Sequence, residues 1–277
     1  MKWTSRASGD TQDAPENTHQ GTITCERADS SSSTQRALLA MGAVSAFGCY
    51  MLITIDRPSL AVILAAYSSQ CLLLVPYTSY RKSAIRQRAA TAWRLRVGAT
   101  TSSASFAAFL YNQAIIVLTT CTIVVAAWMA WTSPETPAGG LTATVLGSAL
   151  FATNVSGIRQ NPLVVPTAAA IMMTADGIRT WPGTRHASQI PWGDRPTVYG
   201  AHGGKLIVGT RSGKLHAVPM SYLRLGCVQL SRVIDFYTRH PELRHELTTP
   251  EGLARVQLLM DNTVEQVEQS LRSQHRK

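Results

Sequence analysis

Four stretches of this 277-residue chain contain no acidic, basic or histidine side chain, and they constrain its fold more than any other feature. They cover residues 37–55, 59–80, 105–131 and 141–158. A helix needs about 20 mostly apolar residues to cross the roughly 30 Å hydrocarbon core of a membrane. We therefore expect four transmembrane helices within residues 37–158.

The short gaps between these stretches predict how the helices connect. A three-residue turn separates the first two, which should form a tight antiparallel hairpin with Pro58 in the first turn of the second helix. The third and fourth should form another hairpin. Trp128 and Trp131 stand where the third span should meet the membrane interface, a place that favours aromatic residues. The small residues Gly42 and Ala46 would let the first span approach a neighbour closely.

The basic residues predict which side of the membrane each loop occupies. The loop 81–96 carries basic residues and no acidic one, namely Arg81, Lys82, Arg86, Arg88, Arg94 and Arg96. Loops rich in Lys and Arg stay cytoplasmic. Both termini are then cytoplasmic, in the inner membrane of a bacterium, a source that the Arg-, Ala- and Thr-rich composition favours. Residues 1–36 are polar and rich in Ser and Thr, and are expected to form a disordered cytoplasmic tail.

Three amide side chains stand out inside the apolar spans, because these spans hold no ionisable residue. They are Asn112, Gln113 and Asn154. Coupled transporters normally use buried ionisable groups, so hydrogen bonding between helices is the favoured role. The alternative is a small transporter or membrane enzyme with a polar site in the helix bundle, which requires that the three residues face one another.

Residues 159–245 have the composition of a soluble domain and alternate short β-type runs with turn signals. Asp176-Gly177 is a strong turn pair, and residues 211–213 join the two strands of a hairpin. An amphipathic helix should follow at about 222–238. Its apolar face consists of Leu223, Cys227, Leu230, Val233, Ile234 and Tyr237.

This order of elements resembles the bacterial pleckstrin-homology-like domains often found beside membrane helices. The resemblance rests on TADGI at 174–178, on IPW at 190–192 followed by Asp194, on the Gly-turned hairpin 205–220 and on the helix after it. It implies a small α+β barrel that this helix closes, and it implies no enzyme. The chain departs from the family at 195–196, where Arg-Pro stands in place of an aliphatic residue.

Trp192 and Asp194 have two possible roles. Trp192 could dip into the membrane interface. An aromatic residue that follows Ile-Pro within a β-pattern is usually packing, however, so we expect Trp192 to fill the core of the barrel. Asp194 should then close a turn through its own backbone.

The soluble domain carries an excess of basic side chains, which are candidates for contact with anionic lipid headgroups or with a protein partner. They are Arg179, Arg185, Arg195, Lys205, Arg211 and Lys214. Arg211 and Lys214 flank the tip of a hairpin, a good position for reaching phosphates. With apolar spans next to the domain, a membrane surface is a simpler partner than nucleic acid. Plain solvation of the strand faces is the alternative.

The last segment, 246–277, predicts one amphipathic helix over 250–273. Thr249 suits the cap of this helix, and Pro250 and Glu251 suit its first turn. Apolar residues recur at spacings of three and four, namely Leu253, Val256, Met260, Val264, Val267 and Leu271. This face either packs on the domain or pairs with a second copy of the chain, which would make the protein an oligomerising regulatory subunit.

The sequence predicts no reaction, no cofactor and no metal site. His240 and His245 are five residues apart, so they and Glu242 do not share a helix face. The five cysteines form no CxxC pair and behave as small apolar residues. The leading hypothesis is an integral membrane protein that acts in binding or scaffolding, whose basic cytoplasmic domain contacts anionic lipid or protein partners.

Overall fold

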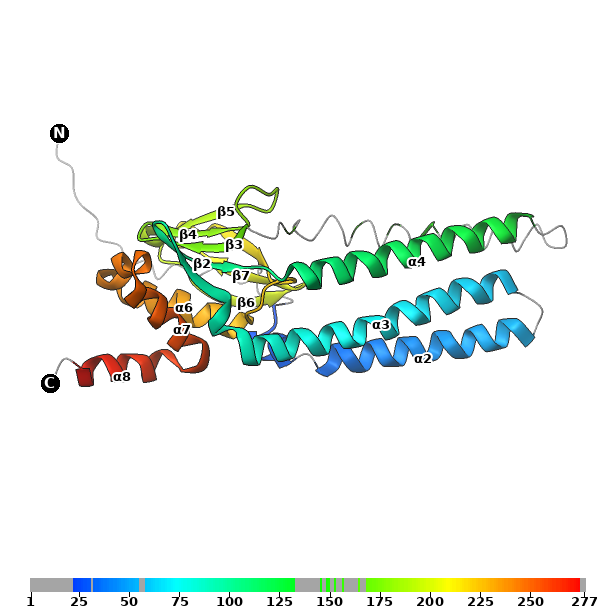
Figure 1. The fold of residues 1–277 in the computed structure, drawn as a ribbon, viewed down its shortest axis with the longest axis horizontal. Helices are drawn as coiled ribbons and strands as arrows, with labels where there is room; N and C mark the ends of the chain where they lie inside the picture. Colours follow the sequence, from blue (N-terminus) through cyan, green and yellow to red (C-terminus); the bar gives the residue numbers. More distant parts are fainter. Residues whose placement is uncertain are drawn as a thin grey trace, which may run out of the picture.

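A computed structural model of the chain describes residues 22–30, 32–54, 58–132 and 168–274, with six isolated positions between 145 and 164. The molecule is elongated. Two β-sheets and several short helices form a domain at one end, and three long helices project from this domain side by side (Figure 1). Both ends of the described chain lie in or beside the domain.

The three long helices are α2 (Ser32–Thr54), α3 (Pro58–Arg88) and α4 (Phe106–Thr132). α2 and α3 run antiparallel, as the short turn predicts, and α3 begins at Pro58. Gly42 lets the pair pack tightly, because a β-carbon there would stand only 3.4 Å from the side chain of Leu72. The Ser68 hydroxyl donates a hydrogen bond of 2.9 Å to the Gly42 carbonyl, which joins the two helices further.

The prediction of four transmembrane helices is wrong for the described part of the chain. Within the residues described, only two segments are long and apolar enough to cross a membrane, Arg36–Thr54 and Phe106–Val125. The predicted span 59–80 lies in α3, where the side chains at several positions, 62, 63, 66 and 70 among them, lie outside the described residues. The predicted span 141–158 lies outside the described residues, apart from isolated positions.

A five-stranded antiparallel sheet combines segments from both sides of α4. Its strands, in sheet order, are β1 (Trp93–Arg96), β2 (Ala99–Ser103), β3 (Ala169–Met173), β4 (Gly177–Thr180) and β5 (Ser188–Pro191). β2 pairs with β3, so that Ser102 lies opposite Ile171. The domain therefore does not begin at residue 159, because β1 and β2 come from the segment before α4. The chain leaves the sheet at Ala104 and has returned to it at Ala169.

A second sheet contains three antiparallel strands, β6 (Thr197–His202), β7 (Lys205–Gly209) and β8 (Leu215–Pro219). The two sheets do not close on each other, so the predicted pleckstrin-homology-like barrel is wrong. The break falls where the chain departs from the family pattern. Arg195 adopts a φ of 46°, and Pro196 has no N–H to donate to a ladder. These two residues lie between β5 and β6, which belong to different sheets.

Helix α6 (Cys227–Arg239) closes the core. It begins later than the predicted 222, so Leu223 lies before it, but every residue of the predicted apolar face is buried. Trp192 is also buried, with only 1% of its surface exposed, and its ring lies 6.1 Å from that of Tyr237. The indole N–H of Trp192 donates to the Thr174 carbonyl at 2.8 Å. The packing role expected for Trp192 is thus confirmed, although the core lies between open sheets and helices rather than inside a barrel.

The predicted C-terminal helix is broken in two. After η4 (Pro241–Thr248), α7 (Pro250–Asp261) ends at Asn262, and α8 (Val264–Gln274) begins after Thr263. The Thr263 backbone N–H donates to the side chain of Gln266 at 2.8 Å, and this local cap starts a new helix. The prediction of one continuous helix is therefore wrong. Most of its apolar face is buried against the domain, including Val256, Leu259, Met260, Val264 and Val267.

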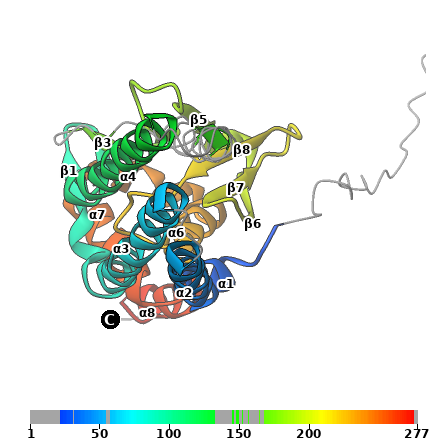
Figure 2. The same ribbon diagram turned by 90° about the vertical axis from the view of Figure 1, so that its right-hand side faces the viewer.

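Part of the segment expected to be disordered is folded onto the domain. Ile23 forms an antiparallel bridge with Ala201 of β6, and α1 (Cys25–Ser30) lies beside α6 (Figure 2). The Asp29 carboxylate accepts hydrogen bonds of 2.9 Å from the backbone N–H groups of Cys227 and Val228, at the first turn of α6. The expectation of disorder thus fails for residues 22–30.

Candidate functional site

The point where the long helices meet the domain holds the densest set of polar and aromatic contacts between the two parts. α4 starts here because Ser105 caps it, accepting a hydrogen bond of 3.3 Å from the Ala108 N–H through its hydroxyl. The Ser105 N–H in turn donates to the Tyr222 carbonyl at 2.8 Å. Ala104 forms a bridge with Leu223. The segment after β8 therefore fixes the direction in which α4 leaves the sheet.

Tyr222 connects α4 to the domain through its side chain as well. It is 2% exposed, and its ring meets that of Phe109 edge-on at 5.5 Å. Its hydroxyl accepts a hydrogen bond of 3.1 Å from the Asn112 amide and also bonds with Gln113. Burial raises the pKa of Tyr222 to about 12, so this phenol stays neutral. Two of the three predicted bundle amides thus serve a helix-to-domain joint.

The third predicted amide, Asn154, lies outside the described residues. The described part of the chain therefore offers no polar site in the helix bundle made by all three. Asn112 and Gln113 stand two turns into α4, close to the domain rather than at mid-helix. Their bonding to Tyr222 is the kind of role that we favoured for them, with a domain residue instead of a second helix as partner.

Tyrosines also tie α3 to α4 and to the domain. The rings of Tyr77 and Tyr111 stack with centroids 6.2 Å apart. The Tyr77 hydroxyl donates to the Ser221 carbonyl at 2.9 Å, and the Tyr111 hydroxyl donates to the Leu73 carbonyl at 2.7 Å. Pro76 has no N–H to donate to the Leu72 carbonyl, and the bond from Tyr111 goes to the next carbonyl of the same turn of α3.

An apolar groove of about 290 Å³ opens between α3 and α4 at this joint. Its lining consists of Pro76, Tyr77, Tyr80, Ala107, Ala108 and Tyr111. A smaller recess shares three of these residues and continues to Ser105, Ser221 and Arg224. The Nε atom of Arg224 is buried and has no hydrogen-bond partner among the described residues. We call the groove and this recess together the junction groove.

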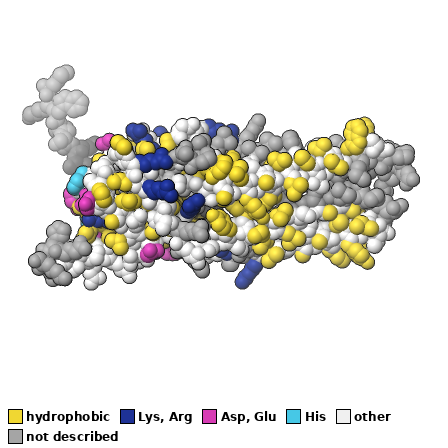
Figure 3. Space-filling view, in the orientation of Figure 1, with side chains coloured by type: hydrophobic (Ala, Val, Ile, Leu, Met, Phe, Trp, Pro, Cys, Tyr) yellow, Lys and Arg dark blue, Asp and Glu magenta, His cyan; other side chains and the backbone are white. Residues whose placement is uncertain are grey.

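Charge and apolar surface separate at the same joint. The last eight residues of α3, 81–88, contain four basic residues and no acidic one. Side chains exposed along α2 and α4 are mostly apolar, whereas Lys and Arg side chains gather over the sheet-containing end (Figure 3). The junction groove therefore lies at the boundary between an uncharged rod and a basic domain.

The basic residues predicted as contacts do not converge on one patch. Arg179 lies on the outer face of the five-stranded sheet, in one row with Arg94 of β1. Arg211 and Lys214 are exposed at the β7–β8 hairpin, and Lys205 is at the other end of β7. Arg185 and Arg195 are exposed in the connections on either side of β5. These basic residues could therefore contact one partner together only over a broad surface.

Two polar groupings lie elsewhere in the domain, around His216 and around His240. The Ser188 hydroxyl lies 2.6 Å from Nδ1 of His216, which joins β5 to β8. This pair is a poor candidate for a nucleophile and its base, because His216 is 6% exposed and neither residue lines a cavity described here. Burial, and then the charge of Lys214, lower the pKa of His216. We interpret the pair as a joint between the sheets.

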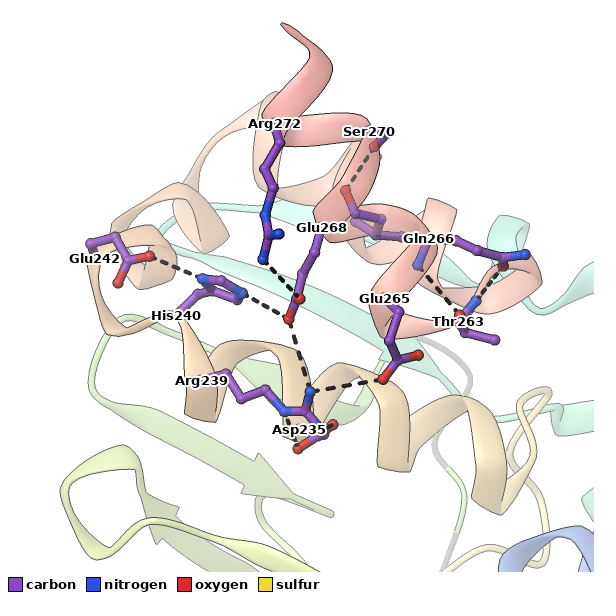
Figure 4. Close-up of polar contacts among 11 residues, drawn as sticks. Asp235, Arg239, His240, Glu242, Thr263, Glu265, Gln266, Glu268, Ser270 and Arg272 are labelled. Atoms are coloured by element: carbon purple, nitrogen blue, oxygen red, sulfur yellow. Dashed lines mark hydrogen bonds and ion pairs between the residues drawn. The ribbon is translucent and has the colours of Figure 1, made fainter. Parts of the chain in front are cut away.

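The second grouping surrounds His240, which the sequence analysis did not predict to bind a metal. His240 lies between Glu242 and Glu268, at 3.0 and 3.1 Å from its two ring nitrogens (Figure 4). Arg239 pairs with Asp235 at 2.6 Å on the same side of α6. Within the described residues no group of His, Cys, Asp and Glu could hold a metal ion. The cluster instead fastens α8 to α6.

The largest cavity described, about 560 Å³, lies between α1, β6, α6 and α8. Its charged residues are largely used within the domain. Arg232 donates to the carbonyls of Met260 and Asn262 at 3.4 and 3.2 Å, and Asp235 pairs with Arg239. The charged side chains of this cavity are therefore mostly paired already, whereas the junction groove has an Arg224 Nε atom without a partner among the described residues.

Comparisons of the chain with known protein families, with curated proteins and with solved structures find no match. The sequence analysis overlooked its main residues, Tyr77, Tyr80, Tyr111, Tyr222 and Arg224. One signal was present, because three of these tyrosines stand near the ends of predicted apolar spans, where aromatic residues concentrate.

Proposed function

We propose that the protein is a membrane-anchored binding or scaffolding protein, whose projecting helices hold the sheet-containing domain at an anionic membrane surface. The observation that carries this proposal is the boundary at the junction groove. On one side of it the helices expose large apolar side chains, and on the other side the chain is basic. Apolar patches of this extent on a protein surface mark contact with a membrane or a partner.

The dimensions of α4 support a membrane rather than a partner protein. Trp128 and Trp131 are 70% and 74% exposed at its far end, and Tyr111 is near its start. A helix rises 1.5 Å per residue, so these rings stand roughly 26–30 Å apart along the axis. That separation matches the thickness of the hydrocarbon core, with aromatic side chains at both interfaces.

The basic end supports placing the domain on the cytoplasmic side, at the headgroups. Basic residues near a membrane are attracted to anionic lipid by about 1 kcal/mol each, screened by salt. The spread of these residues favours a broad contact with lipid over one narrow pocket. Protein partners could then bind the faces of the domain that remain free.

Two alternatives receive less support. A transporter or enzyme site in the bundle would need Asn112 and Gln113, which are engaged by Tyr222. Oligomerisation through 250–273 would need an apolar face that is largely buried within the domain.

The decisive test is membrane integration of the full chain. Val117 and Leu118 are exposed at mid-length of α4, and changing both to Lys should release much of the protein from carbonate-washed membranes. Each Lys at the centre of a span opposes insertion by about 2.5–3.5 kcal/mol. Leu258→Lys, at a similarly exposed apolar residue of α7, is the matched control and should remain integrated. Release of the unaltered chain by carbonate would overturn the proposal.

A further inference from the structure

We infer that the junction groove binds one anionic phospholipid, with an acyl chain between α3 and α4 and the phosphate beside Arg224. This inference rests on the proposed membrane anchoring, and it assigns to the groove a ligand of stated chemistry. Three features of the groove carry it, namely its apolar lining, an unused buried donor and its place at the membrane interface.

The groove has the surface that a hydrocarbon chain requires. Pro76, Ala107 and Ala108 line it with small apolar side chains, and Tyr77 and Tyr111 line it with aromatic rings. Its volume of about 290 Å³ is near the lower limit of ligand pockets, which suits part of a chain rather than a whole molecule.

The recess behind the groove has the donor that a phosphate requires. A buried guanidinium N–H without a partner is unfavourable, and Arg224 Nε has none among the described residues. No acidic side chain is found among the described residues that line the groove and its recess. The recess has about 10 Å³ of room, the space of one water, so a single phosphate oxygen would enter it and the rest of the phosphate would stand at its mouth. That oxygen would satisfy the donor with a charge-assisted hydrogen bond, and guanidinium groups bind phosphate well.

The surroundings favour a lipid over a soluble phosphate compound. The groove stands one turn from the basic end of α3, at the level where aromatic side chains meet lipid headgroups. A phospholipid is the ligand that presents an acyl chain and a phosphate together at this level. A neutral peptide segment would fill the apolar part and leave Arg224 unpaired.

The experiment is native mass spectrometry of the full chain purified in mild detergent, with phosphatidylglycerol or phosphatidylcholine added. We expect one phosphatidylglycerol to be retained in preference to phosphatidylcholine. Arg224→Gln should weaken this retention roughly tenfold or more, because it removes the charged donor, and Arg224→Lys should retain part of it. Ala107→Phe should also weaken it, by filling the groove from an exposed position of α4.

Matched controls separate the groove from general lipid attraction. Arg272→Gln removes a charge that is 81% exposed on α8, outside the groove, and Ala114→Phe adds the same ring two turns further along α4. Both should bind phosphatidylglycerol like the unaltered chain. Equal retention of the two lipids, unchanged binding in Arg224→Gln and Ala107→Phe, or displacement by glycerol phosphate alone would overturn the inference. A chain that integrates into membranes yet retains no lipid refutes only this inference, and the proposed function then stands.

Discussion

Asp29 provides a sharp test of how the N-terminal segment is held, because it caps a helix that lies 198 residues away in the sequence. Its two carboxylate oxygens accept hydrogen bonds of 2.9 Å from the N–H groups of Cys227 and Val228. Gly226 makes room for this contact, since a β-carbon there would overlap the Asp29 carboxylate. Replacing Asp29 by Ala should therefore uncap α6 and loosen α1.

The expected effect follows from these two bonds. Loss of a helix cap destabilises by roughly 0.5–2 kcal/mol, and loss of a negative charge at a helix N-terminus adds about 0.3–1 kcal/mol at a surface. We expect Asp29→Ala to lower the free energy of opening this region by about 1–2 kcal/mol, which raises the open population roughly 5- to 30-fold. Asp29→Asn keeps one acceptor oxygen and should have a smaller effect.

The assay is thiol labelling of Cys227, quantified by mass spectrometry. Cys227 is buried at the first position of α6, so its labelling rate should follow the open population when opening is fast and reversible. Glu26→Gln removes an exposed acidic charge from the same short helix and is the matched control, with no change expected. Equal rates for Asp29→Ala and the unaltered chain, or equal acceleration by Glu26→Gln, would refute the reasoning.

Two further predictions test the sheets. Gly177→Ala should lower the melting temperature, because a β-carbon there would lie 2.6 Å from a backbone carbonyl oxygen of β5, whereas Gly193→Ala meets nothing within 4 Å and should be nearly neutral. A strained Gly177 variant that melts like the Gly193 variant would contradict this geometry. Burial lowers the pKa of His216 from its usual 6.5, so the unfolded chain takes up a proton at a higher pH than the folded one. Stability should therefore fall as the pH drops below about 6.5 and stay level above it. Between about pH 7.5 and 5.5, the melting temperature should fall less for His216→Gln than for the unaltered chain. Identical curves for the two proteins would show that His216 does not cause the pH dependence.

The local pattern predicted several elements well. The apolar face of α6 was found from its helical spacing, because one side of a helix must be apolar if it is to cover a sheet. Trp192 was placed in the core for a similar reason, since a large aromatic ring in a β-pattern needs burial. The antiparallel pairing of α2 and α3 followed from a three-residue turn. Each of these predictions depends on residues close together in the chain.

The predictions that failed depended on partners distant in the sequence. Residues 93–103 look like the end of a basic loop, yet they form two strands, because β2 pairs with a strand almost 70 residues later, where Ser102 faces Ile171. A hairpin signal was present in Val97-Gly98, and Gly98 adopts a φ of 74° in the turn. The basic residues around this signal favoured a loop prediction instead, because a run of basic residues is also typical of a solvated loop.

The sequence by itself indicated that α2, α3 and α4 are helices, where charge begins and which faces need burial, because these properties depend on side-chain type and spacing. Only the tertiary structure decided that α4 departs from within the five-stranded sheet, that the sheets stay open at Arg195-Pro196, and that Asp29 caps α6. It also brought Tyr77, Tyr111 and Arg224 to one groove. Contacts of this kind are selected by the packing of the whole chain, and they leave no periodic mark in the local sequence.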